Sequence, residues 1–292
     1  MIYDIRHVTT YSYDSPVSFA RCSLRLEPRS GDGQQLVSHS VDIRPRPADR
    51  TVRRDFFGTH TESIVVETAH RHLRIDSRSR VSVSRRAPGR TAPSPAWEDV
   101  RDLAFEAVSL GPASPVGYVF ASALVPVQPA VTAYASASFP RGMGVLVGTV
   151  DLMHRIRSEF KYDPKATVIS TPLEEVFEKR HGVCQDFAHV MIAGLRGLGL
   201  PAAYVSGYLR TIPPEGKPRL QGADATHAWV SLWCGPRLGW IGFDPTNDLL
   251  VENDHIILGV GRDFSDVSPV DGIIVGSRKQ KLSVAVDVML VE

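Results

Sequence analysis

The segment from Cys184 to Leu198 constrains the fold more than any other part of the chain. It reads CQDFAHVMIAGLRGL, and its apolar residues recur three and four positions apart, which is the spacing of one helix face. These positions are Phe187, Val190, Met191, Leu195 and Leu198. Gly199 and Pro201 follow and predict the end of the helix. The next segments, AAYVSGYL, HAWVSLWC and LGWIGFD, indicate strands.

Cys184 stands in the predicted first turn of this helix. The free backbone N–H groups and the dipole at a helix start favour an anion, and the thiolate is the nucleophilic form of cysteine. The same N–H groups can bind an oxyanion that develops beside the sulfur. Cysteine is also a common core residue and a zinc ligand. Position alone therefore leaves three roles open for Cys184: nucleophile, core residue and metal ligand.

A thiol nucleophile needs a base and a group that orients this base. His227 lies in DATHAWVSLW, and Asp244 lies in WIGFDPTND, where the following proline ends the strand. Two antiparallel strands joined by CGPRLG would bring His227 and Asp244 side by side. Each residue alone also fits a structural role, His227 as a histidine within a strand and Asp244 as a turn residue before proline. Together with Cys184 they form a candidate catalytic triad.

Other polar residues near this candidate site have several possible roles. Asp186 would lie near the second or third helical position, where its carboxylate can accept from free N–H groups, so we expect a structural role. Gln185 could polarise a carbonyl group or only line the cleft. His181 and His189 are alternative bases, but neither has an obvious orienting group. A buried polar network behind the site is expected from His255, Arg262 and Asp263.

The first 85 residues indicate an all-β region. Short alternating segments are separated by turn residues, as in FARCSLRLEP, where Cys22, Leu24 and Leu26 share a face. Several such strands are typical of an antiparallel sandwich. The segment RRAPGRTAPSPAW is rich in Pro, Gly and Ser and predicts a boundary. We therefore expect an α+β chain with an N-terminal β-sandwich over 1–85, a linker with short helices over 86–145 and a catalytic core over 146–292.

Three blocks of the sequence carry a resemblance to a known family. GVCQDFAHVMIAGLRGLGLPAAYVSGY, THAWV and GWIGFDPTN resemble the three catalytic blocks of the transglutaminase-like superfamily, and more narrowly its bacterial cysteine-protease-like branch. YSYDSPV, LRLEPRSGDGQQLV and DFFGTH are similar to the β-rich region that precedes the core in this branch, and the tail HIILGVGRDFSDVSPVDGIIVGS is similar too. The resemblance covers nearly the whole chain, with 86–145 the least distinctive part. It implies a papain-like core, in which a nucleophile helix packs on an antiparallel sheet.

The resemblance also implies a role for each matched residue. Cys184 corresponds to the nucleophile, His227 to the base that later acts as acid, and Asp244 to the orienting group. The motif does not fix the second oxyanion donor. We expect Tyr162 in EFKYDPKAT to take this role, because such cores often use an upstream aromatic residue. The alternative is a half-buried tyrosine at a helix end.

The triad predicts a thiol enzyme that attacks an amide carbonyl and forms an acyl-enzyme. Water as acceptor gives a peptidase or amidase, and an amine gives a transglutaminase or a peptide ligase. We expect hydrolysis, with the loop RTIPPEGKPRLQGADA (210–225) selecting the acceptor. A catalytically silent peptide-binding module and acyl transfer from a thioester carrier are alternatives. A zinc site would lack a fourth ligand at close spacing.

Composition and charge bear on the partners and the compartment of the protein. The 33 basic and 32 acidic residues leave a net charge of +1, which does not favour nucleic acid or an anionic membrane. Three cysteines do not form a disulfide framework, and this favours a reducing compartment. MIYDIRHVTT lacks the apolar run of a signal peptide, and no stretch approaches the roughly 18 apolar residues of a membrane span. We expect a cytoplasmic protein with no cofactor and no metal that acts on a peptide or protein substrate. Homo-oligomerisation stays open.

Overall fold

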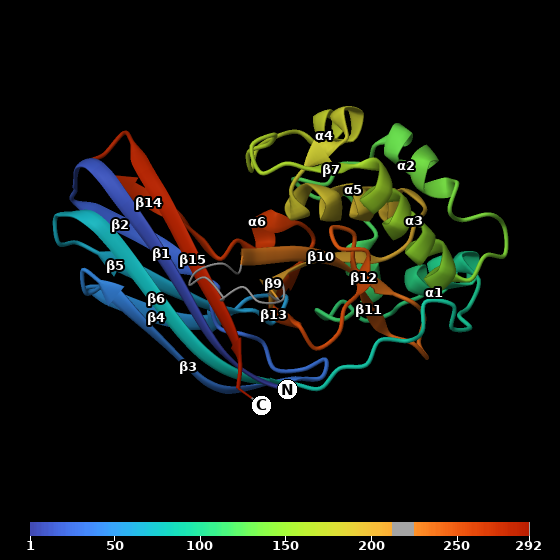
Figure 1. The fold of residues 1–292 in the computed structure, drawn as a ribbon, viewed down its shortest axis with the longest axis horizontal. Coiled ribbons are helices and arrows are strands. Elements are labelled where there is room, and N and C mark those ends of the chain that lie inside the picture. The colour runs from blue at the N-terminus through green and yellow to red at the C-terminus, as the bar shows by residue number, and fades with distance from the viewer. Residues whose placement is uncertain (212–224, 292) are drawn as a thin grey trace, which may run out of the picture.

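The computed structural model describes residues 1–211 and 225–291 and contains two parts that lie side by side. One part is a β-sandwich, and the other is a sheet covered by helices (Figure 1). This arrangement confirms the predicted α+β class with an N-terminal antiparallel sandwich. None of the helices within the described residues is long and apolar enough to cross a bilayer.

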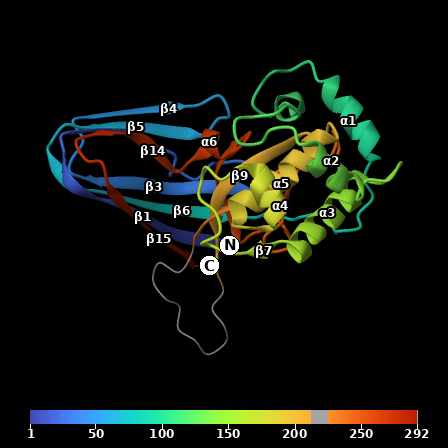
Figure 2. The same cartoon turned by 90° about the horizontal axis from the view of Figure 1, so that it is seen from above.

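Two four-stranded antiparallel sheets form the sandwich, and Figure 2 shows them as two layers. The first sheet has the order β15-β1-β6-β3, with β1 at Ile2–Val17, β3 at Gln34–Arg44, β6 at His70–Val83 and β15 at Gln280–Leu290. The second has the order β14-β2-β5-β4, with β2 at Phe19–Leu24, β4 at Asp49–Arg54, β5 at His60–Val66 and β14 at Val270–Val275. Buried residues alternate along β1 because successive side chains of a strand point to opposite faces.

The two last strands of the chain complete this sandwich. β15 pairs along β1 from Tyr3 opposite Leu290 to Tyr13 opposite Gln280, so the two chain ends lie close together in Figure 1. β14 pairs with β2 in the other sheet. The expected boundary of the catalytic core, 146–292, therefore needs a correction. Residues 270–290 belong to the sandwich, because their backbone hydrogen bonds are made with strands of the N-terminal region.

The second part is built on a five-stranded antiparallel sheet with the order β12-β11-β10-β9-β13. Its strands are β9 at Ala202–Leu209, β10 at Ala225–Trp233, β11 at Trp240–Asp244, β12 at Leu249–Leu250 and β13 at His255–Gly261. The helices are α1 at Trp97–Phe105, η1 at Pro115–Tyr118, α2 at Pro129–Ser136, α3 at Val145–Glu159, α4 at Leu173–Lys179, α5 at Cys184–Gly197 and α6 at Phe264–Val267. A short parallel pair joins β7 at Lys161–Tyr162 to β8 at His181–Gly182.

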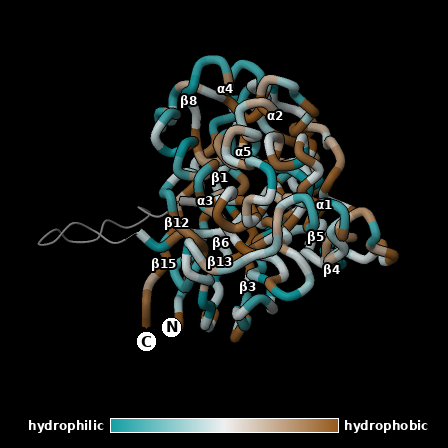
Figure 3. The backbone as a smooth tube through the Cα atoms, turned by 90° about the vertical axis from the view of Figure 1, so that its right-hand side faces the viewer, coloured by the Kyte–Doolittle hydropathy of each residue, from teal (hydrophilic) through white to brown (hydrophobic). Residues whose placement is uncertain are grey.

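Helix α5 lies at the centre of the second part. It packs on β9 and β10 and is covered by α2, α3 and α4, and Figure 3 shows apolar segments around it. Every residue from Asp186 to Arg196 is buried. Two glycines let α2 come close: a Cβ at Gly194 would lie 2.7 Å from the Cβ of Ala135, and one at Gly197 would lie 2.0 Å from the hydroxyl of Thr132. α5 is therefore packed on both sides, against the sheet and against the covering helices.

The sandwich and the second part share an apolar core where they meet. This junction contains Tyr3, Ile5, Val81, Val83, Val286 and Val288 from the sandwich and Tyr208, Ile256 and Leu258 from the five-stranded sheet. A polar contact lies beside it, in which the hydroxyl of Tyr3 donates to Asp254 Oδ1 at 2.9 Å. Because neither part can bury these residues alone, we expect the two parts to fold as one unit.

Replacing Leu258 with alanine tests this junction. Leu258 is 1% exposed, so Leu258→Ala should lower the free energy of unfolding by about 2–5 kcal/mol. The four tryptophans of the chain, Trp97, Trp229, Trp233 and Trp240, all lie outside the sandwich strands. Tryptophan fluorescence therefore reports on the second part, whereas far-ultraviolet circular dichroism reports on both parts. If the two parts unfold together in urea, both signals should have the same midpoint, and the substitution should shift both midpoints equally.

Val108→Ala is the matched control, because this side chain is fully exposed and its loss should change the free energy by less than about 0.5 kcal/mol. Two separate unfolding transitions in the wild-type protein would contradict a shared core.

Candidate active site

The start of α5 is held by a side chain from its own first turn. Asp186 Oδ2 accepts from the backbone N–H of Val183 at 2.8 Å and from the hydroxyl of Thr167 at 2.6 Å. Gly182 leaves room for this carboxylate, since a Cβ there would lie 2.6 Å from it. Burial raises the pKa of Asp186, although these two hydrogen bonds oppose the shift. Asp186 therefore fixes the position of Cys184, the first residue of the helix, by structural contacts.

Cys184 differs from the other two cysteines in its exposure. Cys22 and Cys234 are buried in the sandwich and in the core of the second part, at 6% and 0% exposure. Burial raises the pKa of the Cys22 thiol to about 11, and it raises the pKa of Cys234 as well. Cys184 is half-buried and lines a cavity, so its sulfur is the cysteine sulfur that a substrate can reach.

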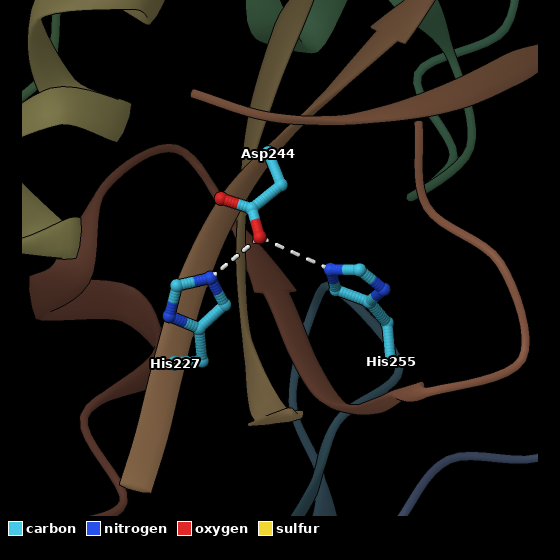
Figure 4. A group of neighbouring side chains, drawn as sticks. All are labelled: His227, Asp244 and His255. Carbon is cyan, nitrogen blue, oxygen red and sulfur yellow. Dashed lines mark hydrogen bonds and ion pairs between the residues drawn. The ribbon is translucent and has the colours of Figure 1, made fainter. Parts of the chain in front are cut away.

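His227 and Asp244 meet at the ends of neighbouring strands. β10 and β11 pair with Val230 opposite Phe243, and this register brings the last residue of β11 next to His227. His227 Nε2 lies 2.8 Å from Asp244 Oδ2. A carboxylate only accepts hydrogen bonds, so Nε2 carries the proton of this contact. Nδ1 is turned away from the carboxylate (Figure 4) and is left for the sulfur of Cys184.

Asp244 is fully buried and has several donors around it. Besides His227, its Oδ2 accepts from His255 Nε2 at 3.1 Å and from Asn247 Nδ2 at 2.7 Å. Its Oδ1 accepts from the backbone N–H groups of Thr246 and Asn247 at 3.0 and 3.2 Å. Burial alone would raise the pKa of Asp244, but the hydrogen bonds from the two histidines outweigh burial and hold this pKa well below its usual range. Asp244 is therefore a carboxylate at neutral pH.

The charge on Asp244 controls the protonation of His227. Burial lowers the pKa of His227, whose side chain is 9% exposed. The hydrogen bonds with Asp244 and Cys184, together with the negative charges of these groups, outweigh burial and raise the pKa of His227 to about 10. The site thus favours the imidazolium form of His227 at neutral pH, and a positive charge beside a cysteine sulfur is typical of a reactive cysteine.

His255 joins this cluster through Asp244, whereas the sequence predicts it in a polar network behind the site with Arg262 and Asp263. It is 3% exposed, and its ring packs edge-on against Trp229 with 5.2 Å between the ring centroids. The network expected from His255, Arg262 and Asp263 is wrong as a single group. Arg262 pairs with Asp266, and Asp263 accepts from the backbone N–H of Leu124 and from Ser265. No local spacing points to His255, because β13 reaches the site by pairing with β9, a strand far from it in sequence.

Three of these side chains could also hold a metal ion. The ligand atoms of His227, Asp244 and His255 lie within 4.8 Å of one another. Both histidine nitrogens already donate hydrogen bonds to Asp244 Oδ2 (Figure 4). An ion would therefore have to displace both protons before it could bind.

Two cavities flank His227. The first has a volume of 350 Å³ and is lined by Cys184, Gln185 and His227 together with residues of the sandwich. The second has a volume of 290 Å³ and is lined by His227, Tyr162, Asn247 and Arg157. Gln185 makes a long contact with the carbonyl of Ile169, at 3.5 Å, and its side chain lies in the wall of the first cavity. The site is thus open on both sides of the imidazole.

Tyr162 lies close to the nucleophile. It is 52% exposed, and its ring packs edge-on against Phe187 of α5 at 6.4 Å. Burial and the nearby Cys184 raise its pKa, so its hydroxyl stays protonated at neutral pH and can donate. Most of the loop 210–225, which we expected to select the acceptor, lies outside the described residues.

The two alternative bases have other surroundings. His189 is 5% exposed within α5, accepts from the backbone N–H of Phe264 at 3.3 Å and packs on Tyr204. Burial lowers its pKa to about 4, so it is neutral at physiological pH. His181 is exposed in β8. Among the described histidines, only His227 and His255 contact Asp244.

The chain is similar to known proteins along most of its length. Residues 3–82 match the bacterial transglutaminase-like N-terminal region, and residues 147–245 match the transglutaminase-like superfamily. The uncharacterized protein Rv2569c of Mycobacterium tuberculosis is 41% identical over 299 residues, which cover 98% of this chain and 92% of that protein. A protein-glutamine gamma-glutamyltransferase of Pseudomonas aeruginosa is 31% identical over 109 residues, which cover 35% of this chain and 16% of that protein.

The fold is also similar to a solved structure. A candidate cysteine protease from Cytophaga hutchinsonii superposes with a TM-score of 0.73 at 18% identity, and the match covers 100% of this chain and 92% of that one. The likeness includes the sandwich as well as the helix-covered sheet, since it spans the full chain. With the two family matches and the arrangement of α5, β10 and β11, the chain belongs to the transglutaminase-like superfamily, in the bacterial branch with this N-terminal region.

Proposed function

We propose that this protein is a thiol hydrolase that cleaves an amide bond of a peptide or protein through an acyl-enzyme on Cys184. One observation carries the proposal: Asp244 accepts a hydrogen bond from Nε2 of His227. The other ring nitrogen of His227 is then available to the sulfur of Cys184 at the start of α5. A nucleophile, a base and an orienting group in this relation are the machinery of acyl transfer.

The first half of the reaction forms the acyl-enzyme. The Cys184 thiolate attacks the carbonyl carbon, a carbon–sulfur bond forms, and the carbonyl electron pair moves to the oxygen. The free N–H groups in the first turn of α5 stabilise this oxyanion, and Tyr162 is the candidate for a second donor. His227 then donates its proton to the amide nitrogen as the carbon–nitrogen bond breaks, and the amine leaves.

The second half of the reaction regenerates the thiolate. His227 is now neutral and removes a proton from water, whose oxygen attacks the thioester. The acid leaves, and the proton on His227 restores the ion pair with Cys184. An amine in place of water would give a transglutaminase or a peptide ligase with the same residues. Among similar proteins, one is named as a protein-glutamine gamma-glutamyltransferase and another as a candidate cysteine protease.

Removal of the nucleophile gives the first test. Cys184→Ala should abolish release of aminomethylcoumarin from a library of peptidyl amides, because no other described side chain is positioned to form the acyl-enzyme. Cys22→Ser should retain activity, since Cys22 is buried in the sandwich. Thermal melting of both variants checks the fold. Residual turnover in Cys184→Ala would remove Cys184 from the role of nucleophile, and inactivity of every folded form would favour the silent binding module.

Addition of a primary amine to the same assay distinguishes the acceptors. With putrescine present, a hydrolase should still release the free acid, whereas a transferase should form the putrescine amide, and mass spectrometry separates the two products. A predominant amide product would replace the proposed hydrolase with an acyltransferase.

The groups around His227 give the next test. Asp244→Asn should lower kcat by up to about 10⁴-fold, because an amide that donates to Nε2 favours the wrong tautomer of His227. His255→Phe should lower kcat by about 10-fold to 100-fold with little change in KM, because Phe has no donor and Asp244 loses a positioning contact. His72→Phe is the control, since His72 is an exposed histidine of the sandwich. Equal rates for His255→Phe and His72→Phe would show that the contact between His255 and Asp244 has no role in turnover.

The ion pair predicts a distinct pH dependence. The raised pKa of His227, about 10, means that the imidazolium persists below that pH and is lost only as pH rises through it. Because a positive charge beside a cysteine favours its reactive form, alkylation of Cys184 by iodoacetamide at about pH 6 to 7 should be faster in the wild type than in His227→Ala. In His227→Ala the thiol loses this partner, and the rate should fall steeply as the pH decreases. Mass spectrometry of each cysteine, with a chelator present, measures both profiles; identical profiles would contradict the ion pair.

A further inference from the structure

The first cavity at the site is closed on one side by the sandwich. Along β1, His7, Thr9 and Tyr11 point to one face, as alternate residues of a strand do, and all three line this cavity. From β15, Leu282 and Val284 line it as well. The strand register sets Tyr11 opposite Leu282 and Thr9 opposite Val284. These two cross-strand pairs form a continuous surface, which we call the sandwich wall.

The sandwich wall is apolar where it meets solvent. Leu282 is 52% exposed and Val284 is 47% exposed, so two aliphatic side chains face open space beside the nucleophile. Among the described residues that line the cavity there is no Asp, Glu, Lys or Arg. Burial lowers the pKa of His7 to about 4 and raises the pKa of Tyr11 to about 12, so both are neutral at physiological pH. Away from Cys184 and His227 themselves, a charged group entering this cavity would lose water and find no partner of opposite charge on the sandwich wall.

The order of the chemical steps assigns the cavity to one half of the substrate. The acyl group stays bonded to Cys184, and Cys184 lines this cavity but not the second one. The departing amine takes its proton from His227, which also lines the second cavity with Tyr162 and Asn247. The acyl half of the substrate therefore lies against the sandwich wall, and the amine half lies on the other side of the imidazole.

We propose that the sandwich wall is the specificity subsite for the acyl half of the substrate, and that it selects a large, uncharged apolar side chain beside the carbonyl group that Cys184 attacks. The cavity volume of 350 Å³ lies within the range of small-ligand sites, about 300–1,000 Å³. Leu282 and Val284 gain burial when such a side chain binds. This inference rests on the proposed function of Cys184 and adds the substrate class to it.

Affinity labels test the sandwich wall without a need for turnover. Peptidyl chloromethyl ketones with Phe, Leu, Glu or Lys beside the reactive carbon are added to the full-length protein. The Cys184 sulfur forms a bond to the methylene carbon, and chloride leaves with the electron pair. Each rate is divided by the rate with iodoacetamide, which has no side chain to bind. We expect the normalised rates for Phe and Leu to exceed those for Glu and Lys by about tenfold or more.

A negative charge introduced on the sandwich wall should change the preference of the protein among the four labels. Leu282→Glu and Val284→Glu should each remove most of the preference for Phe and Leu and should raise the rate with Lys. Ile273→Glu is the matched control, because Ile273 is 64% exposed on β14 and does not line the cavity. Its normalised rates should equal those of the wild type. Melting curves check the fold of each variant.

Two results would overturn the proposal: equal normalised rates for all four labels in the wild type, or the same loss of preference in Ile273→Glu as in Leu282→Glu. A different result bears on the chemistry instead. If iodoacetamide modifies Cys184 no faster than a free cysteine, the proposed function fails, while the normalised ratios still decide whether the wall selects apolar groups.

Discussion

A buried carboxylate organises the site, and the protonation and orientation of the other groups depend on it. Asp244 has no exposed surface, and an ion in such a position is strongly destabilising unless hydrogen bonds replace its water. Two histidines, an asparagine side chain and two backbone N–H groups supply those bonds. Because the carboxylate accepts from Nε2 of His227, the other ring nitrogen is left for Cys184. This buried charge thus sets the orientation of His227 and, together with Cys184, raises its pKa.

Cys184 is held from the other side of the cleft by the start of a buried helix. Asp186 bonds to the residue before Cys184, and α2 lies close to α5 because glycines face it. α5 packs on β10, which carries His227, so the helix and the base belong to one packed unit. Rigid elements of this kind hold reacting groups more accurately than loops do. The site is therefore assembled by packing and does not depend on loop closure among the described residues.

The sandwich is part of this unit in two ways. An apolar junction joins it to the five-stranded sheet, and its first and last strands form one side of the cavity that contains Cys184. β15 has a central place here, because it pairs with β1 over its whole length and carries Leu282 and Val284. A region that could have been a separate domain thus contributes surface to the cavity that contains the Cys184 sulfur.

The sequence by itself predicted most elements of the fold and the residues of the candidate triad. The apolar spacing after Cys184 predicts α5 to within one residue of its end, and alternation predicts the sandwich strands. The triad residues can be named because each stands at a recognisable position in a local pattern, namely a helix start, a strand and a strand end. Local patterns extend over about one element, since helix and strand periods describe neighbours along the chain.

Tertiary structure decided which distant segments meet. His255 reaches Asp244 although no spacing relates them. Leu282 and Val284 line one cavity with Cys184 although they lie about one hundred residues further along the chain. Both results depend on strand order and register, which arise from pairing between segments far apart in sequence. The same kind of pairing places residues 270–290 in the sandwich, although the sequence predicts them in the catalytic core. A strand sequence specifies which face is apolar, but the partner that covers this face is selected only when the whole chain packs.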